Sequence, residues 1–521
     1  MQYDHSKNKE EHPDPIKAEV KGNLPGWLQG TLLRNGPGMF TVGDTSYNHW
    51  FDGMALMHSF TFKNGDVTYR SRYLRGDTYK SNMEAKRIVV SEMGTMAYPD
   101  PSKNIFTKVI TFLSQTIPDF TDNCGNNIIR YGSDYYATSE TNYIRKIDPE
   151  TLETLDKVDY LKYLSVNLVT SHPHYDKEGN TYNMGTTIAE KGKTKYTVFK
   201  VPSTAEGGSE MIPVLKNLEV LSTVPCRSLL TPSYYHSFGM SENYFIFIEQ
   251  PLKLDLLKMA TAYLRGVNWA TCLKFHSEDN TLIHLIDRKT GKEVATKFFT
   301  DAMLVCHHVN AFEENGHVVF DVIAYNDNSL YEMFYLSKLK EESEEIRKAY
   351  SKPKCKRFVL PIQTDKEAQI GDDLVKLKFT TASAVKDKEG KLLCQPEVLC
   401  EGVELPRINY DFNGQKHGYV YFVCAEMSPI PSKVMKFDIE MRKMLQWAED
   451  NCWPSEPVFI ANPTAIEEDD GVVLSSVIST DPLKSNFLLV LDAGSFTEIA
   501  RAYVDVELHM DMHGIFIPQH S

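Results

Sequence analysis

The sequence has few of the features that mark a secreted or membrane-spanning protein. Its nine cysteines are scattered singly and form no C-x-x-C pair. This usage predicts reduced, mostly buried thiols and argues against a disulfide framework or a structural zinc site. No run of about 18 uncharged apolar residues occurs, so we expect no membrane-spanning helix.

Targeting signals and a basic surface are also missing. The N-terminal stretch MQYDHSKNKEEHPDP has neither the apolar core of a signal peptide nor the Arg-rich pattern of a transit peptide. The formal net charge is −14, which argues against a general nucleic-acid-binding role because phosphate recognition needs a basic face. We therefore expect a cytoplasmic protein that binds no nucleic acid.

What the sequence has instead is a recurring β-rich segment. The chain is 521 residues long and 42% hydrophobic, enough for a large core. About seven segments begin with turn residues and continue as short apolar or aromatic runs. They start near residues 64, 132, 178, 241, 315, 417 and 470. Irregular repeats of this kind are typical of β-propeller blades, although their divergence leaves the blade count open. We expect one all-β domain over residues 1–521.

Few helices are expected among these strands. Residues 104–120 are strongly apolar and carry few charges. Residues 251–269 combine leucines with Lys253, Lys258 and Arg265. Both segments are interpreted as helices outside the repeats.

Four histidines recur just before repeat segments. His172, His236 and His307 follow one another at about one repeat, and His513 comes about three repeats later. A residue that recurs once per blade occupies an equivalent place in each blade, so these side chains are expected to converge on the propeller axis. However, the chain has 16 histidines, and spacing alone does not select four of them. The alternative is that they are ordinary surface or structural histidines.

A convergent set of four neutral imidazoles suits Fe, Zn, Cu or Ni. With two octahedral positions left open, the arrangement favours non-haem Fe(II) over structural zinc, whose ligand set is closed. Glu140, Glu404 and Glu456 occupy similar places near strand ends. Metal-bound histidines usually donate their second ring N–H to an acceptor, and these glutamates are candidates for that role.

Several longer motifs show a resemblance to a known family. They are LPGWLQGTLLRNGPGMF, YNHWFDGMALMHSF, SHPHYD, PSYYHSFG, HHVNAFE, WPSEPVF, EEDDGVVLS and DMHGIF. With these motifs the chain resembles the carotenoid cleavage oxygenases over essentially its whole length. Within the family, the stretches ATSETNYIRKIDPETLETLDKVDY and TDAMLVCHHVNAFEENG are most similar to members that cleave the central double bond.

The resemblance implies a seven-bladed propeller under a helical dome, with one Fe(II) per chain on the axis and O₂ as co-substrate. The implied iron ligands are His172, His236, His307 and His513. The implied carboxylate partners are Glu140 for His236, Glu404 for His307 and Glu456 for His513, with none for His172. Since neighbouring side chains of a strand point to opposite faces, His308 is expected to point away from the metal.

The implied reaction is oxidative cleavage of β-carotene and related provitamin A carotenoids at the 15,15′ double bond, giving retinal. The resemblance places Phe51, Tyr234, Tyr325 and Trp453 in a substrate tunnel, where ordinary aromatic core packing is the alternative. It also implies peripheral membrane or lipid contact through 104–120 and 251–269, with packing into the dome as the alternative.

Two departures from the family pattern bear on these expectations. Relatives often carry Cys in the stretch PDPSKNIF, where this chain has Ser102, so a lipid anchor is absent there. Relatives commonly have an aromatic residue before the HH pair, where this chain has Cys306. The alternatives are therefore eccentric cleavage of carotenoids or apocarotenoids, retinyl-ester isomerohydrolysis on the same fold, or a non-catalytic carotenoid-binding propeller. The oligomeric state is not predicted.

Overall fold

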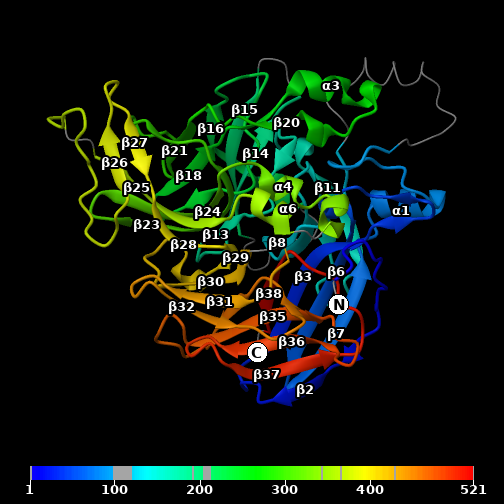
Figure 1. Cartoon of the computed structure of the whole chain (residues 1–521). Helices are drawn as coiled ribbons and strands as arrows, with labels where there is room; N and C mark the ends of the chain where they lie inside the picture. Colours follow the sequence, from blue (N-terminus) through cyan, green and yellow to red (C-terminus); the bar gives the residue numbers. More distant parts are fainter. Residues whose placement is uncertain are drawn as a thin grey trace.

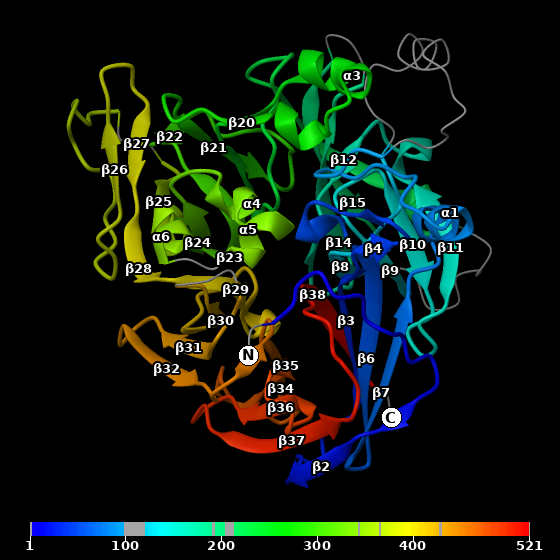
Figure 2. The same cartoon turned by 45° about the vertical axis from the view of Figure 1, so that its right-hand side comes forward.

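Strands dominate the computed structural model, which describes residues 3–97, 120–189, 193–203, 213–341, 344–363, 366–426 and 430–519. Seven sheets of four to six strands are arranged in a ring and form a seven-bladed β-propeller (Figures 1 and 2). The fold class expected from the repeats and the resemblance is confirmed.

We number the blades along the chain and name the strands of each from the inside outward. Blade 1 holds β38 (His513–Pro518), β3 (Gly30–Met39), β6 (Met54–Lys63), β7 (Asp66–Tyr73) and β1 (Ile16–Lys17). Blade 2 holds β8 (Asn127–Tyr131), β9 (Asp134–Thr138), β10 (Tyr143–Ile147) and β11 (Thr154–Asp159). Blade 3 holds β12 (Leu168–Val169) and β13 (His174–Tyr175), both paired with β14 (Thr181–Thr187), then β15 (Lys195–Val201) and β16 (Glu219–Pro225).

The remaining four blades follow the same plan. Blade 4 holds β17 (Gly239–Met240), β18 (Tyr244–Glu249), β21 (Thr281–Asp287), β22 (Phe298–Thr300), β27 (Leu392–Gln395) and β26 (Ser383–Lys386). Blade 5 holds β23 (Leu304–Glu314), β24 (His317–Tyr325), β25 (Lys354–Pro361) and β28 (Glu397–Glu401). Blade 6 holds β29 (Val403–Arg407), β30 (Tyr419–Cys424), β31 (Val434–Asp438) and β32 (Lys443–Trp447). Blade 7 holds β33 (Cys452–Pro454), β34 (Val458–Ala461), β35 (Gly471–Ser479), β36 (Asn486–Asp492), β37 (Glu498–Val504) and β2 (Glu19–Gly22).

Each recurrent sequence segment belongs to a different blade. The seven segments form β7, β9, β14, β18, β24, β30 and β35. The hairpin between β23 and β24 illustrates the turn chemistry: Asn315 and Gly316 both have positive φ, at 47° and 75°. Two consecutive residues with positive φ favour an Asn-Gly turn, because its twist matches that of the flanking strands.

The two ends of the chain close the ring. The last strand, β38, pairs antiparallel with β3, with Asn35 opposite His513 and Arg34 opposite Gly514. The early strand β2 pairs with β37 of blade 7. Strands from both ends of the chain thus complete blades 1 and 7, and β38 carries His513 to the inside.

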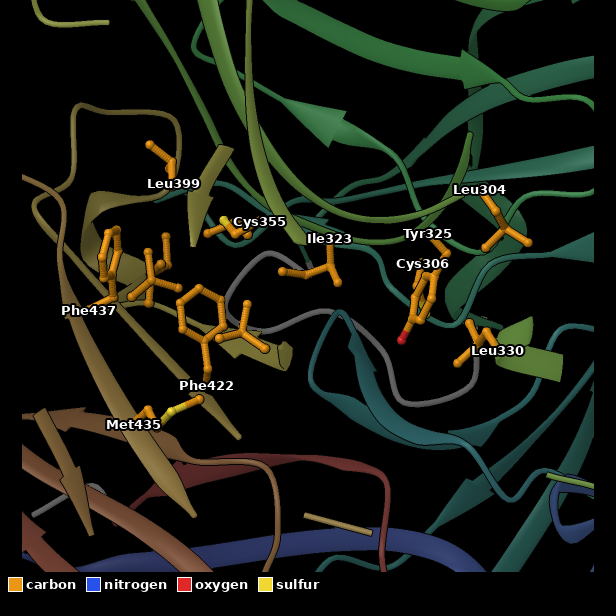
Figure 3. Packing of buried hydrophobic residues seen from close by; sticks show 14 of the residues in the cluster. Leu304, Cys306, Ile323, Tyr325, Leu330, Cys355, Leu399, Phe422, Met435 and Phe437 are labelled. Carbon is orange, nitrogen blue, oxygen red and sulfur yellow. The ribbon is translucent and has the colours of Figure 1, made fainter. Parts of the chain in front are cut away.

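The core lies between neighbouring blades. Figure 3 shows one such cluster, which contains Leu304 and Ile323 of blade 5 together with Phe422 and Phe437 of blade 6. Cys306 and Tyr325 lie at one end of this cluster (Figure 3). The apolar packing of blade 5 therefore continues up to the residues beside His307.

Helices are few and lie outside the blades (Figure 1). Those in the described residues are α1 (Asp77–Ala85), α3 (Leu256–Arg265), α4 (Ser329–Glu332), α5 (Leu336–Lys340) and α6 (Glu344–Ala349). Short 3-10 turns are η1 (Trp50–Asp52), η2 (Tyr160–Lys162), η3 (Val214–Asn217), η4 (Trp269–Cys272) and η5 (Tyr410–Phe412). Two small ribbons pair β4 (Thr41–Val42) with β5 (Thr45–Ser46), and β19 (Leu252–Leu254) with β20 (Leu273–Phe275).

The helix expected over 251–269 is shorter than predicted. Residues Leu252–Leu254 form β19 because they pair with β20, and the helix α3 occupies only Leu256–Arg265. The other expected helix, 104–120, lies outside the described residues except for Phe120, and so does Ser102. In the described part of the chain, no helix has both the length and the apolar character needed to cross a membrane.

Candidate metal centre

Four histidines from four blades meet inside the ring. His172 follows β12, His236 precedes β17, His307 lies within β23 and His513 opens β38. One ring nitrogen of each lies within 4.8 Å of the corresponding nitrogen of every other. The Nε2 atoms of His172 and His236 are 3.0 Å apart. The structure thus brings together the four histidines that the sequence and the family resemblance singled out.

Three glutamates hold the outward ring nitrogens of three of these histidines. The Nδ1–H of His307 donates to Glu404 Oε1 at 2.7 Å, and that of His513 donates to Glu456 Oε2 at 2.6 Å. His236 Nδ1 bonds Glu140 in the same way. An ionised carboxylate only accepts, so the proton lies on Nδ1 and the Nε2 lone pair faces inward.

All seven blades therefore contribute one group to the site. Blades 1, 3, 4 and 5 supply histidines, whereas Glu140, Glu404 and Glu456 come from blades 2, 6 and 7. Among the described residues, no carboxylate accepts a hydrogen bond from His172. The pairing expected from the resemblance matches this geometry.

Burial keeps two of the four histidines, His172 and His513, in the neutral form that binds a metal. Burial lowers the pKa of His172 well below its ordinary value, and it lowers the pKa of His513 to about 4 although Glu456 opposes the shift. Metal binding requires the neutral imidazole. Within the described part of the chain, Nε2 of His513 is buried without a hydrogen-bond partner. An orphaned nitrogen and two Nε2 atoms facing each other fit a bound metal ion, and four imidazoles suit Fe, Co, Ni, Cu or Zn.

His308 takes no part in this cluster. It stacks on Phe320 at 6.2 Å between ring centroids, and a side chain on Gly239 would come within 2.9 Å of its Nδ1. Burial lowers its pKa to about 3. Of the adjacent pair, His307 faces the metal site and His308 packs into blades 4 and 5.

A cavity of about 270 Å³ opens over the histidines. Its wall includes three of the four predicted tunnel residues, Phe51, Tyr234 and Tyr325. The Tyr325 hydroxyl also donates to Glu404 Oε2, so this tyrosine connects the cavity wall to the partner of His307.

The fourth predicted tunnel residue, Trp453, lies elsewhere. It is outside the cavity wall and packs against the core cluster that includes Leu508 and Ile478. Its neighbour Pro454 does line the cavity. Adjacent residues of β33 point to opposite sides, so only one of the two can face the site.

The sequence did not identify several aromatic side chains of the cavity. Phe334 stacks on Phe51 at 4.8 Å, and Tyr331 contacts Tyr234 at 6.0 Å between centroids. Trp269 also lines the cavity. These residues lie in segments outside the blades that carry no repeat, so no periodic signal could have identified them.

The chain also matches known proteins along its whole length. Residues 5–518 match the family model described as retinal pigment epithelial membrane protein. The chain is 63% identical to β,β-carotene 15,15′-dioxygenase of Gallus gallus, over 99% of this chain and 98% of that one. The chain belongs to the carotenoid cleavage oxygenase family.

Two further relatives show higher and lower sequence identity to this chain. The chain is 60% identical to β,β-carotene 15,15′-dioxygenase of Homo sapiens, over 98% of this chain and 94% of the relative. It is 42% identical to the mitochondrial carotenoid-cleaving dioxygenase of Mustela putorius furo, over 98% and 95% of the two chains. Among solved structures, cobalt-substituted Synechocystis apocarotenoid oxygenase matches with a TM-score of 0.74 at 21% identity, covering 98% of each chain. At that identity the likeness shows the shared fold alone.

The surface of helix α3 has some of the features expected for contact with lipid. Leu257 and Leu264 are exposed on this helix. Lys253, in the segment expected to contact lipid, is paired with Asp279 at 2.5 Å. Contact between this surface and a membrane stays a prediction.

We expect acid to destabilise the metal-free form of this protein. Burial lowers the pKa of seven histidines, which are His5, His49, His172, His174, His308, His509 and His513. In the unfolded chain these seven histidines take up protons near pH 6.5, whereas in the folded chain their lowered pKa values delay protonation to lower pH, so the stability of the folded state falls as the pH drops below about 6.5. Each such histidine adds a slope of up to about 1.4 kcal/mol per pH unit.

Urea unfolding of the metal-free protein at pH 7 and pH 5 measures this effect. The variant His308→Leu, which removes one buried imidazole without touching the metal cluster, should show a shallower loss. Equal unfolding free energies at the two pH values would contradict the prediction.

Proposed function

We propose that this family member is an iron(II)-dependent dioxygenase that cleaves β-carotene and related provitamin A carotenoids at the central 15,15′ double bond, giving retinal. The observation that carries the proposal is the cluster of four inward-facing imidazoles, three of which line an aromatic-lined cavity. The chain's 63% identity to a β,β-carotene 15,15′-dioxygenase supports the proposed substrate and the proposed position of cleavage.

In this proposal His172, His236, His307 and His513 are the metal ligands. Four neutral imidazoles would hold iron(II) here, and the bound metal would supply the activation of O₂ beside the substrate. Glu140, Glu404 and Glu456 hold the Nδ1 protons and so fix the direction of each Nε2 lone pair. Tyr325 in turn holds Glu404.

The cavity wall positions the polyene. A carotenoid is long and apolar, and the aromatic side chains Phe51, Phe334 and Tyr234 offer it an apolar surface that excludes water. If positive charge develops along the polyene, each aromatic face stabilises it by about 1–2 kcal/mol in a desolvated site. No side chain is required as a general base, since the protein's contribution is to hold one double bond at the metal.

Product analysis tests the proposal. The purified, iron-loaded protein is incubated with β-carotene under O₂, and the products are separated by chromatography. Retinal as the single product is expected. Long and short apocarotenoids would move the scissile bond to an eccentric position, and isomerised retinoid from a retinyl ester without O₂ consumption would support an isomerohydrolase. No turnover of any carotenoid by the iron-loaded protein would overturn the dioxygenase assignment.

A further inference from the structure

Glu456 differs from the other two glutamates of the metal centre. Its Oε2 accepts from His513, while its Oε1 accepts from two arginines, Arg34 at 2.9 Å and Arg407 at 2.8 Å. Glu404 is held instead by the Tyr325 hydroxyl and the Leu405 backbone N–H. Among the described side chains, no arginine bonds Glu140 or Glu404. The His513–Glu456 pair therefore has charged hydrogen-bond partners of its own, which are Arg34 and Arg407.

Arg34 also bonds the chain segment that carries His513. Its second terminal nitrogen donates to Asp511 Oδ1 at 2.8 Å and to the Met512 carbonyl at 3.3 Å. Asp511 Oδ2 accepts from His58 at 2.7 Å and from Ser476 at 2.8 Å. One guanidinium thus bonds both Glu456, the partner of His513, and Asp511, which lies two residues before His513.

The geometry of this contact depends on the shape of arginine. Arg34 lies on β3 directly opposite Gly514 of β38, so its side chain starts next to the ligand strand. The planar fork can bind two carboxylates in fixed directions, which a flexible ammonium group cannot do. Arg34 and Asp511 are almost fully buried, at 1% and 0% side-chain exposure, so solvent cannot replace the lost contacts.

We propose that Arg34 and Asp511 are positioning residues for the metal ligand His513. They hold Glu456 and the segment 511–513 in one arrangement, and so set the direction in which His513 offers its Nε2 to the metal. The inference rests on the proposed function only in that it requires a metal at the four histidines. Neither residue is proposed to touch the substrate or the metal.

The chain offers a matched control in blade 5. Arg357 binds Asp321 through two bonds of 2.8 and 2.9 Å, with side-chain exposures of 3% and 0%. His417 lies 3.3 Å from the same aspartate. This Arg–Asp–His group matches Arg34, Asp511 and His58 in composition and burial. In the described chain its members neither join the histidine cluster nor line the cavity.

The experiment compares metal binding by Arg34→Gln, Arg34→Lys, Asp511→Asn and Arg357→Gln in the full-length, metal-free protein. Cobalt(II) is the probe, because its visible absorption reports ligand geometry as well as occupancy. We expect Arg34→Gln to weaken cobalt affinity about 10–100-fold, as loss of outer-sphere partners does at other metal sites, and to alter the absorption bands. Arg34→Lys should recover part of the affinity, and Arg357→Gln should bind cobalt as the wild type does. Thermal unfolding of each variant reports general destabilisation separately.

Each outcome decides between the alternatives. Wild-type affinity and spectrum in both Arg34→Gln and Asp511→Asn would overturn the inference. Equal losses in Arg357→Gln would also overturn it, by showing that any buried ion pair has this effect. Should Arg34→Gln fail to fold, Asp511→Asn carries the test, since it keeps the side-chain volume. Failure of the wild type to bind cobalt or iron would instead contradict the metal centre of the proposed function.

Discussion

Replacing His307 with alanine is expected to abolish stable metal binding and to lower β-carotene cleavage below about 1% of wild type. Losing an outer hydrogen-bond partner of a metal ligand costs about 10–100-fold, and losing the ligand itself should cost more. His307 is buried, and it is held by Glu404 at 2.7 Å. Metal content per folded chain, by elemental analysis, and retinal formation are the two measurements.

The adjacent residue provides the control for that experiment. His308 lies one position along the same strand, but it faces Phe320 and Gly239 rather than the other three histidines. His308→Ala is expected to lose some stability through the cavity that it leaves, and to retain the wild-type metal content. A His307→Ala protein that keeps its metal and full turnover would contradict the ligand assignment.

Substituting Cys306 with phenylalanine is expected to lower kcat/KM for central cleavage by about two orders of magnitude with the metal retained. Cys306 lines the cavity, and its Sγ lies 3.8 Å from His307 Nε2. A phenyl ring at this position would fill space that the polyene needs beside the metal. A displacement of about 1 Å of the reacting bond can cost a factor of about 100.

Cys306→Ser is the matched control, since it changes the volume little and adds no ring. We expect near wild-type cleavage from it and the same product. The product profile of Cys306→Phe by chromatography, together with its metal content, distinguishes a blocked cavity from a lost metal. Unchanged central cleavage by Cys306→Phe would show that the polyene does not pass this side chain.

The four histidines differ in the hydrogen-bond partners that surround them, and only the partner of His513 is bonded by arginines among the described residues. His172 has no carboxylate partner in the described chain, Glu140 and Glu404 hold their histidines without arginine, and Glu456 is shared with Arg34 and Arg407. The β38 strand that carries His513 is also the strand that closes the ring. The proposed metal ligand His513 and the closure of the propeller therefore share one strand, which is held by residues of blades 1, 6 and 7.

Much of the fold was predictable because its units are local. Each blade contains a hairpin whose turn residues and alternating apolar positions are close together in the sequence, as at Asn315 and Gly316. The spacing of His172, His236 and His307 followed from the same repeats. The helix at 251–269 was predicted too long because the pairing of β19 with β20 is a longer-range contact than helical periodicity reports.

Some features of the site could be predicted from the sequence, and others depended on the tertiary structure. The repeating blades and the opposite directions of His307 and His308 could be read from the sequence, because turn residues and alternation along a strand are local properties of the chain. The histidine and glutamate candidates could be named from the repeats, and the family resemblance was needed to select them. The folded structure was needed to show that Trp453 faces the core, that Tyr331 and Phe334 line the cavity, and that Arg34 bonds Glu456 across 422 residues of sequence. Those contacts depend on how blades and connecting segments meet, and side chains so distant in sequence leave no periodic signal of their proximity.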